Sequence, residues 1–193
     1  KTWSDVKSER NAKDVWSLSS YKESVTDANG RRTEREWGQA NYDEKGRLTS
    51  FTEKNTNTAG KTSTRRWEKG RYDDRGQLTG YEEHVTDEKG RTSFRGWDEG
   101  RYDENGRVVG YEERTVDADG AAGWRQWKNG DYNAKNELMG FSEKIMDARG
   151  ELSDHDWFGK DYNNGLLAHS FETTTDSRGR LTSKDWTGVY GEK

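Results

Sequence analysis

Aromatic side chains recur at a fixed period in an otherwise polar chain. Tryptophans lie thirty residues apart, a tyrosine follows each by five positions, and a second aromatic residue follows by fourteen. The three series are Trp37, Trp67, Trp97, Trp127 and Trp157; Tyr42, Tyr72, Tyr102, Tyr132 and Tyr162; and Phe51, Tyr81, Tyr111, Phe141 and Phe171. Only the next tryptophan, Trp186, comes one residue early. A constant period of this length indicates a repeat protein in which each repeat is one supersecondary unit.

Two polar turn signals divide each repeat into two strands. Each signal has the form Asp-x-x-Gly, as in Asp87–Gly90 and Asp103–Gly106. Asp at the first position and Gly at the fourth fit a type I turn closed by a left-handed glycine, which is the three-residue hairpin loop. The segments between the turns are rich in Thr, Tyr, Trp, Val and Arg and lack helical periodicity. The pattern predicts an all-β antiparallel meander of about 12–13 strands.

The turn type also predicts the register of the strands. If Asp103 pairs with Arg107, then Trp97 lies opposite Glu113 and Gly100 lies opposite Gly110. The same rule predicts the aromatic pairs Phe51–Trp67, Tyr81–Trp97, Tyr111–Trp127 and Phe141–Trp157, and the charged pairs Glu53–Arg65, Glu83–Arg95 and Glu113–Arg125. Such cross-strand pairs contribute roughly 0.2–1 kcal/mol each. We therefore expect these pairs, and the turn glycines Gly46, Gly76 and Gly106, to be structural residues.

Alternation along the strands places apolar and charged residues on both faces of the predicted sheet. Trp97, Tyr111 and Glu113 share one face, whereas Tyr102 and Val108 share the other. A sandwich would concentrate its apolar residues on one face. We expect an open single-layer or coiled sheet, with a closed barrel or a sandwich as the alternatives. Residues 1–193 would form a single repeat domain, with an atypical N-terminal capping repeat at 1–30 and about five repeats over 31–190.

The composition narrows the functional classes. Hydrophobic residues make up 27% of the chain, but 9 Trp, 9 Tyr and 5 Phe indicate a folded protein rather than a disordered one. The 33 basic and 37 acidic residues are finely mixed, which argues against nucleic acid as a partner. No apolar run approaches membrane-spanning length, so membrane insertion is not expected. The absence of cysteine excludes disulfides and thiolate metal ligands.

The turn strings carry a family resemblance. They read Tyr42-Asp43-x-x-Gly46-Arg47-Leu48, Tyr72-Asp73-x-x-Gly76-Gln77-Leu78 and Tyr102-Asp103-x-x-Gly106-Arg107-Val108. This pattern resembles the YD repeats of Rhs-type bacterial surface and toxin proteins. The resemblance implies a secreted or cell-surface bacterial β-structure that encloses or displays another molecule. The chain departs from that family in its longer, thirty-residue period and in the tryptophan of each repeat.

No residue pattern predicts catalysis, a cofactor or a metal. Strand alternation separates His155 from Asp154 and Asp156, and the alignment of repeats places His155 opposite Glu143, in the position of a cross-strand arginine. His84 and His169 lie among polar residues and are interpreted as surface histidines. Asp117-Ala-Asp119-Gly120 lacks the further oxygen ligands of a calcium loop. We therefore expect a protein that is not an enzyme.

Three functional hypotheses follow from the repeat. The first is a structural segment of a larger bacterial extracellular or cell-surface protein: a stalk, a shell wall, or a scaffold that associates with itself or with the rest of its chain by strand addition at open sheet edges. The second is a glycan-binding surface on which Trp67, Trp97 and Trp127 stack against sugar rings. The third is a wall fragment of an Rhs-like shell around a toxin.

Overall fold

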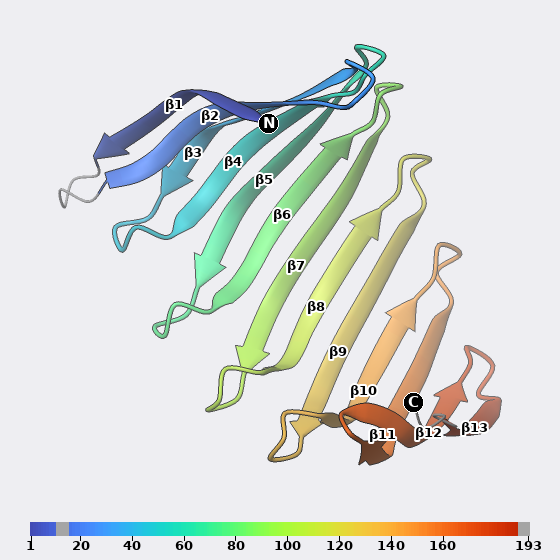
Figure 1. The fold of residues 1–193 in the computed structure, drawn as a ribbon. Coiled ribbons are helices and arrows are strands. Elements are labelled where there is room, and N and C mark those ends of the chain that lie inside the picture. The colour runs from blue at the N-terminus through green and yellow to red at the C-terminus, as the bar shows by residue number, and fades with distance from the viewer. Residues whose placement is uncertain (11–15, 189–193) are drawn as a thin grey trace. The chain divides into compact units, whose positions relative to one another are not determined.

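The computed structural model describes residues 1–10 and 16–188, which form one antiparallel sheet of thirteen strands in the order of the sequence (Figure 1). This part of the chain contains no helix. The sheet is an open meander, so the predicted fold is confirmed and the closed-barrel alternative is wrong. The strands are β1 (Thr2–Arg10), β2 (Trp16–Thr26), β3 (Arg32–Tyr42), β4 (Leu48–Thr56), β5 (Thr62–Tyr72), β6 (Leu78–Thr86), β7 (Thr92–Tyr102), β8 (Val108–Val116), β9 (Ala122–Tyr132), β10 (Leu138–Met146), β11 (Leu152–Asn163), β12 (Leu166–Thr175) and β13 (Leu181–Thr187).

The chain divides into two compact units. The first comprises residues 1–96 with 116–120, and the second comprises 97–115 and the residues from 121 onwards. Neither unit has a thick core, because Tyr21, Trp67 and Trp127 are the only buried hydrophobic residues in the described ranges. Contacts between side chains of neighbouring strands must therefore supply much of the stability of each unit.

The hairpin turns have the predicted geometry. The Asp103 N–H donates to the Arg107 carbonyl at 2.9 Å, and the Gly106 N–H donates to the Asp103 carbonyl at 3.1 Å. The Asp103 carboxylate accepts the N–H groups of Asn105 and Arg107, each at 2.9 Å. Gly46, Gly76 and Gly106 have φ angles of 78°, 85° and 81°, a conformation that glycine adopts without steric cost.

A β-bulge follows the repeat tryptophan and changes part of the predicted register. Lys69 and Asn129, two residues after Trp67 and Trp127, have left-handed φ angles of 56° and 59°. The ladder shifts there, so that Gly80 pairs with Arg71 and Gly140 with Asp131. The glycines at these positions therefore do not face each other in these two hairpins, and the pairing of Gly100 with Gly110 stays a prediction. The extra residue of each bulge displaces the pairing.

The glycine after the bulge provides room for the tryptophan ring. A Cβ atom on Gly70 would lie 2.8 Å from both the Leu48 carbonyl oxygen and the Trp67 Cζ3 atom, and closer still to Trp67 Cη2, which is tighter than such contacts normally allow. Gly130 has the same relation to Trp127 and to the Val108 carbonyl oxygen. The sequence Trp-x-x-Gly is therefore a bulge in which the indole lies over a bare backbone.

The N-terminal repeat is less atypical than the sequence suggested. Trp3 pairs in register with Glu23, as Trp37 pairs with Glu53, and its ring stacks on Tyr21 with centroids 4.7 Å apart. Trp3 therefore takes the place of the repeat tryptophan, whereas Trp16 is 61% exposed. The proposed cap at 1–30 includes residues 11–15, and the proposed repeat range ends at 190; residues 11–15 and 189–190 lie outside the described part.

The loop between β11 and β12 is one residue shorter than the other described hairpin loops. It is Asn164-Gly165, with φ angles of 51° and 79°, and Asn163 pairs with Leu166. Two positive φ angles in a two-residue loop define a type I′ turn. As a result Phe171 pairs with Phe158 on the face opposite Trp157, and Ser170 takes the place of the expected aromatic residue. The assignment of Phe171 to the aromatic series is therefore wrong.

Candidate functional site: the side-chain ladders

The repeat aromatics form a continuous row of neighbouring rings within each unit, in which some pairs are stacked and others are tilted by 30–36°. In the first unit, successive ring centroids are 4.7–5.7 Å apart along Trp3, Tyr21, Trp37, Phe51, Trp67 and Tyr81. In the second unit they are 5.5–5.7 Å apart along Trp97, Tyr111, Trp127, Phe141 and Trp157. Offset aromatic pairs of this kind contribute about 0.5–1.5 kcal/mol each beyond their burial.

The stacking restricts what the proposed glycan-binding tryptophans can contact. Trp67 lies between Phe51 and Tyr81, and Trp127 lies between Tyr111 and Phe141. Each of these two tryptophans is only 7% exposed. Trp97 is half-buried and stacks on Tyr111. Because both ring faces of Trp67 and Trp127 are covered by neighbouring rings, these two residues present little surface on which a sugar could stack.

A row of arginine–glutamate pairs runs beside the aromatic row. Glu53 lies opposite Arg65 in the predicted register, but its carboxylate accepts the Nε–H of Arg35 at 2.7 Å. Arg65 donates instead to Glu83, and Arg125 donates to Glu143, both from Nε at 2.5 Å. The register is thus confirmed for Glu53 and Arg65, whereas the ion pairs join diagonal neighbours on the other flanking strand.

Stacking of the guanidinium groups accompanies this diagonal pairing. The Cζ atom of Arg65 lies 5.4 Å from the ring centroid of Phe51, and that of Arg125 lies 5.9 Å from Tyr111. A guanidinium that covers an aromatic ring gains a cation–π contact while its long stem reaches a diagonal carboxylate. Of the other predicted structural residues, Arg95 is exposed on β7 and Glu113 is half-buried on β8.

His155 takes the place of one arginine in this row. It pairs in register with Glu143, as the sequence predicted, and its Nδ1 atom lies 3.0 Å from a Glu143 carboxylate oxygen. Its Nε2 atom lies 3.4 Å from Glu172 on the next strand. Glu143 also accepts from Arg125, so this carboxylate, which is only 8% exposed, has two nitrogen partners.

Tyrosines link successive hairpins on the opposite face. The Tyr72 hydroxyl donates to the Leu48 carbonyl at 2.7 Å, and the Tyr132 hydroxyl donates to the Val108 carbonyl at 2.9 Å. Arg107 lies over the Tyr132 ring and donates to the Asn133 carbonyl at 3.1 Å. Partial burial raises the pKa of Tyr72 and of Tyr132, so both hydroxyls stay protonated donors at neutral pH. The Tyr five residues after each Trp was visible in the sequence, but its carbonyl partner was not.

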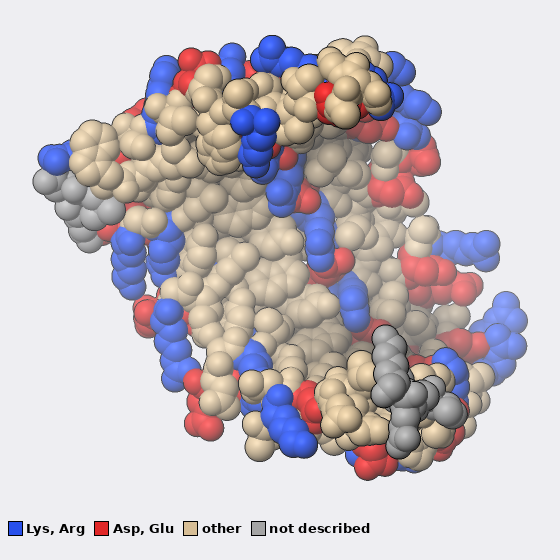
Figure 2. Space-filling model, viewed as in Figure 1, with Lys and Arg blue, Asp and Glu red and all other residues tan. Residues whose placement is uncertain are grey.

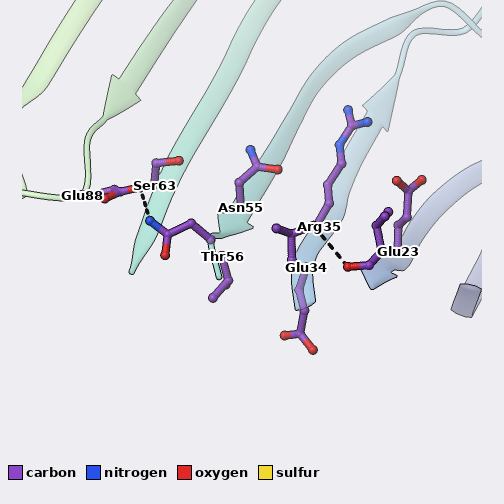
Figure 3. Close-up of a pocket in the computed structure, with 10 residues that line it drawn as sticks. Glu23, Glu34, Arg35, Asn55, Thr56, Ser63 and Glu88 are labelled. Atoms are coloured by element: carbon purple, nitrogen blue, oxygen red, sulfur yellow. Dashed lines mark hydrogen bonds between the residues drawn. The ribbon is translucent and has the colours of Figure 1, made fainter. Parts of the chain in front are cut away.

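A shallow polar hollow lies beyond the arginine–glutamate row in the first unit (Figure 3). Its volume is about 340 Å³, and Glu23, Arg35, Asn55 and Glu88 are among its lining residues. Asn57 donates to Glu88 at 2.6 Å, and Arg35 is engaged by Glu53. The lining contains neither histidine nor a buried nucleophile, so the hollow offers hydrogen-bonding groups but no constellation for covalent chemistry.

Lys and Arg side chains lie beside Asp and Glu on the surface that Figure 2 shows, mostly around areas formed by other residues. No helix in the described ranges could span a membrane. No family model matches the chain, and no curated protein matches it. The class of the protein therefore follows from its fold and its rows of side-chain contacts alone: it is an all-β repeat protein built from two-strand repeats.

Proposed function

We propose that this chain is a non-enzymatic structural segment of a larger bacterial extracellular or cell-surface protein. The proposal rests on the contacts that the recurring side chains make. The aromatic rows, the arginine–glutamate pairs and the tyrosine–carbonyl bonds all join one strand or hairpin to the next. A repeat selected to bind a ligand would keep some recurring groups free for that ligand, whereas here they hold the sheet together.

The outer strands support one specific kind of structural role, a scaffold that associates with itself by strand addition. Among the described strands, β13 has one neighbour, β12, and all seven of its residues are exposed, with Leu181 at 68%. β1 has one neighbour, β2, but a bulge at Asp5, whose φ angle is 52°, interrupts its ladder. Because bulges discourage edge pairing, β13 is the better edge for a second copy or for a further strand of the parent chain.

Sedimentation velocity over a wide concentration range, with electron microscopy of the same samples, tests this form. We expect the sedimentation coefficient to rise with concentration, and the rise to disappear when Leu181→Lys and Ser183→Lys place charge on the β13 edge. The same two-lysine change on β1, at Thr2 and Ser4, is the matched control and should leave association unchanged. A strict monomer at all concentrations would remove the self-associating scaffold and leave the stalk or shell-wall role.

The YD-type turn strings support a more specific version, a wall segment of an Rhs-like shell around a toxin or another cargo. In the turns at Asp43 and Asp103, the Nε–H groups of Arg47 and Arg107 donate to the respective aspartate carboxylates in the same way. This version predicts a long parent chain with further strings of this type on both sides. The length of the parent gene and the domains that flank this segment test this version directly. They also test the proposed secreted or surface location.

Glycan binding through Trp67, Trp97 and Trp127 has less support, because two of the three rings are covered on both faces. A glycan array that compares the parent chain with Trp97→Ala tests it. If the parent chain binds a glycan and Trp97→Ala does not, glycan recognition becomes the leading function.

A further inference from the structure

A second group of side chains gathers on the face opposite the aromatic row of the first unit. Glu68 on β5 lies directly opposite Glu82 on β6, and His84 follows Glu82 by two residues, so that all three share one face. One ligand atom from each of the three side chains lies within 4.8 Å of the other two. The His84 Nε2 atom is 3.8 Å from a Glu68 oxygen, and the His84 ring packs against Phe94 with centroids 5.1 Å apart. The sequence interpretation of His84 as an isolated surface residue missed this neighbourhood.

The equivalent positions of the other repeats show why this group is unusual. Thirty residues further on, the same positions hold Asp98, Glu112 and Arg114, and Arg114 donates to Asp98 at 2.9 Å. In the repeats before and after these two, the position of His84 is occupied by Lys54 and Lys144. A permanent cation therefore occupies this position in the repeats of Lys54, Arg114 and Lys144, and His84, which can ligate a metal, takes its place in the remaining one of these four. Two carboxylates that face each other across a strand pair repel, so a cation between them is favourable.

We propose that Glu68, Glu82 and His84 form a binding site for a divalent transition-metal ion of the zinc type. Two carboxylate oxygens and one imidazole nitrogen are donors that Zn²⁺ accepts, with bonds of about 2.0–2.2 Å. Three protein ligands leave a fourth position for water, which is the arrangement of an open rather than a closed zinc site. The three side chains are half-buried, so each is partly shielded from solvent.

Two neighbouring cationic side chains affect the metal affinity of such a site, because they compete for its carboxylates. Arg66 contacts one oxygen of Glu68, and Lys69 contacts one oxygen of Glu82, both at 2.8 Å. Both cationic side chains are more than half exposed, at 61% and 58%, so their pairs are weak and their carboxylates retain free lone pairs.

The other two histidines lack this arrangement. His155 contacts Glu143 through Nδ1 and Glu172 through Nε2, so that its carboxylates lie on opposite sides of the ring. His169 contacts Asp161 and Asp185 through opposite nitrogens in the same way. A single ion cannot bind one ring nitrogen and both carboxylates in either case. His84 is therefore the histidine around which a metal site can be built.

Calorimetric titration of the whole chain with zinc chloride tests the proposal, with His84→Arg as the loss variant and Arg114→His as the gain variant. The first change copies the next repeat, and the second creates an Asp–Glu–His group there. We expect one zinc ion per parent chain, binding weakened by more than about tenfold in His84→Arg, and a second ion per chain in Arg114→His. Far-UV circular dichroism establishes that each variant is folded.

Three results would overturn the proposal. They are no zinc binding by the folded parent, unchanged binding by folded His84→Arg, and a calcium affinity equal to that for zinc, because calcium prefers sites built only from oxygen. Paramagnetic broadening of the His84 ring resonances by Co²⁺ gives a readout that does not depend on stoichiometry. Broadening of the His155 or His169 resonances instead would also contradict the assignment.

Discussion

The glycines that follow the bulges at Lys69 and Asn129 give the sharpest test of the aromatic row. In the second unit, a Cβ atom on Gly130 would lie 2.9 Å from the Val108 carbonyl oxygen and 2.8 Å from the Trp127 Cζ3 atom, with the Cη2 atom closer still. The carbonyl belongs to the backbone of the neighbouring strand and cannot move away cheaply. We therefore expect Gly130→Ala to displace the Trp127 ring.

Three contributions set the loss of unfolding free energy: two destabilise the folded protein, and one offsets part of that loss. Overpacking of a filled site costs typically 1–3 kcal/mol. Displacement of the ring also weakens its stacking on Tyr111 and Phe141, at about 0.5–1.5 kcal/mol for each pair. Replacement of glycine by alanine restricts the unfolded chain and returns about 0.4–1 kcal/mol. If both stacking pairs are lost, these contributions sum to a loss of about 1–5 kcal/mol of unfolding free energy.

Gly140→Ala is the matched control, because its Cβ atom would meet its nearest neighbours at 3.4 Å or more, which is ordinary contact. We expect this variant to be as stable as the parent or slightly more stable. Urea unfolding followed by tryptophan fluorescence and far-UV circular dichroism gives both midpoints, provided that the slopes agree. If Gly130→Ala were as stable as Gly140→Ala, the indole could not lie over a bare backbone, and the account of the bulge would have to be abandoned.

Three further predictions concern the turns and the opposite face. Gly106→Val should cost more than about 1 kcal/mol, because Gly106 has a φ angle of 81°, whereas Gly106→Asn should cost less, since Asn136 takes the equivalent position at 64°; urea unfolding ranks the two. Tyr132→Phe should cost about 0.5–1.5 kcal/mol by the same assay, because it leaves the Val108 carbonyl without its hydroxyl donor, and no loss would mean that the carbonyl has another partner. The backbone N–H of Arg107 lowers the pKa of Asp103, so its contribution to stability is present above about pH 4 and is lost as the pH falls through the lowered native pKa. Asp103→Asn, which copies Asn133, should therefore flatten the acid side of a plot of melting temperature against pH, and an unchanged slope would contradict the assignment.

The hairpins could be predicted because their determinants are local. Asp at the first turn position and Gly at the fourth fix the loop length, and the loop length fixes which residues face each other. This reasoning placed Phe51 opposite Trp67 and His155 opposite Glu143, as the structure has them. It also places Glu68 opposite Glu82, so the histidine and glutamate group could have been found from the register alone.

The bulge and the direction of the arginines could not be predicted in this way. Lys69 has little intrinsic preference for a left-handed φ angle, and the turn-derived register does not mark it as a bulge residue. The choice of Arg65 between Glu53 and Glu83 depends on the path of a long side chain over the Phe51 ring, which the register does not specify. Trp3 was missed because Trp3 and Tyr21 are eighteen residues apart instead of fourteen.

The early position of Trp186 shows how strictly loop length controls the faces of this sheet. The Asn164-Gly165 loop is one residue shorter than the corresponding loops, so every later position is displaced by one relative to the thirty-residue period. Trp186 pairs with Ser170, which shares the face of Trp157, and a tryptophan at 187 would have pointed to the other face. The displacement of Trp186 therefore compensates for the shorter loop. It keeps the tryptophan on the face of the aromatic row, although Ser170 interrupts the stack between them. The register that the turns impose, rather than the count of residues, determines the place of each aromatic side chain.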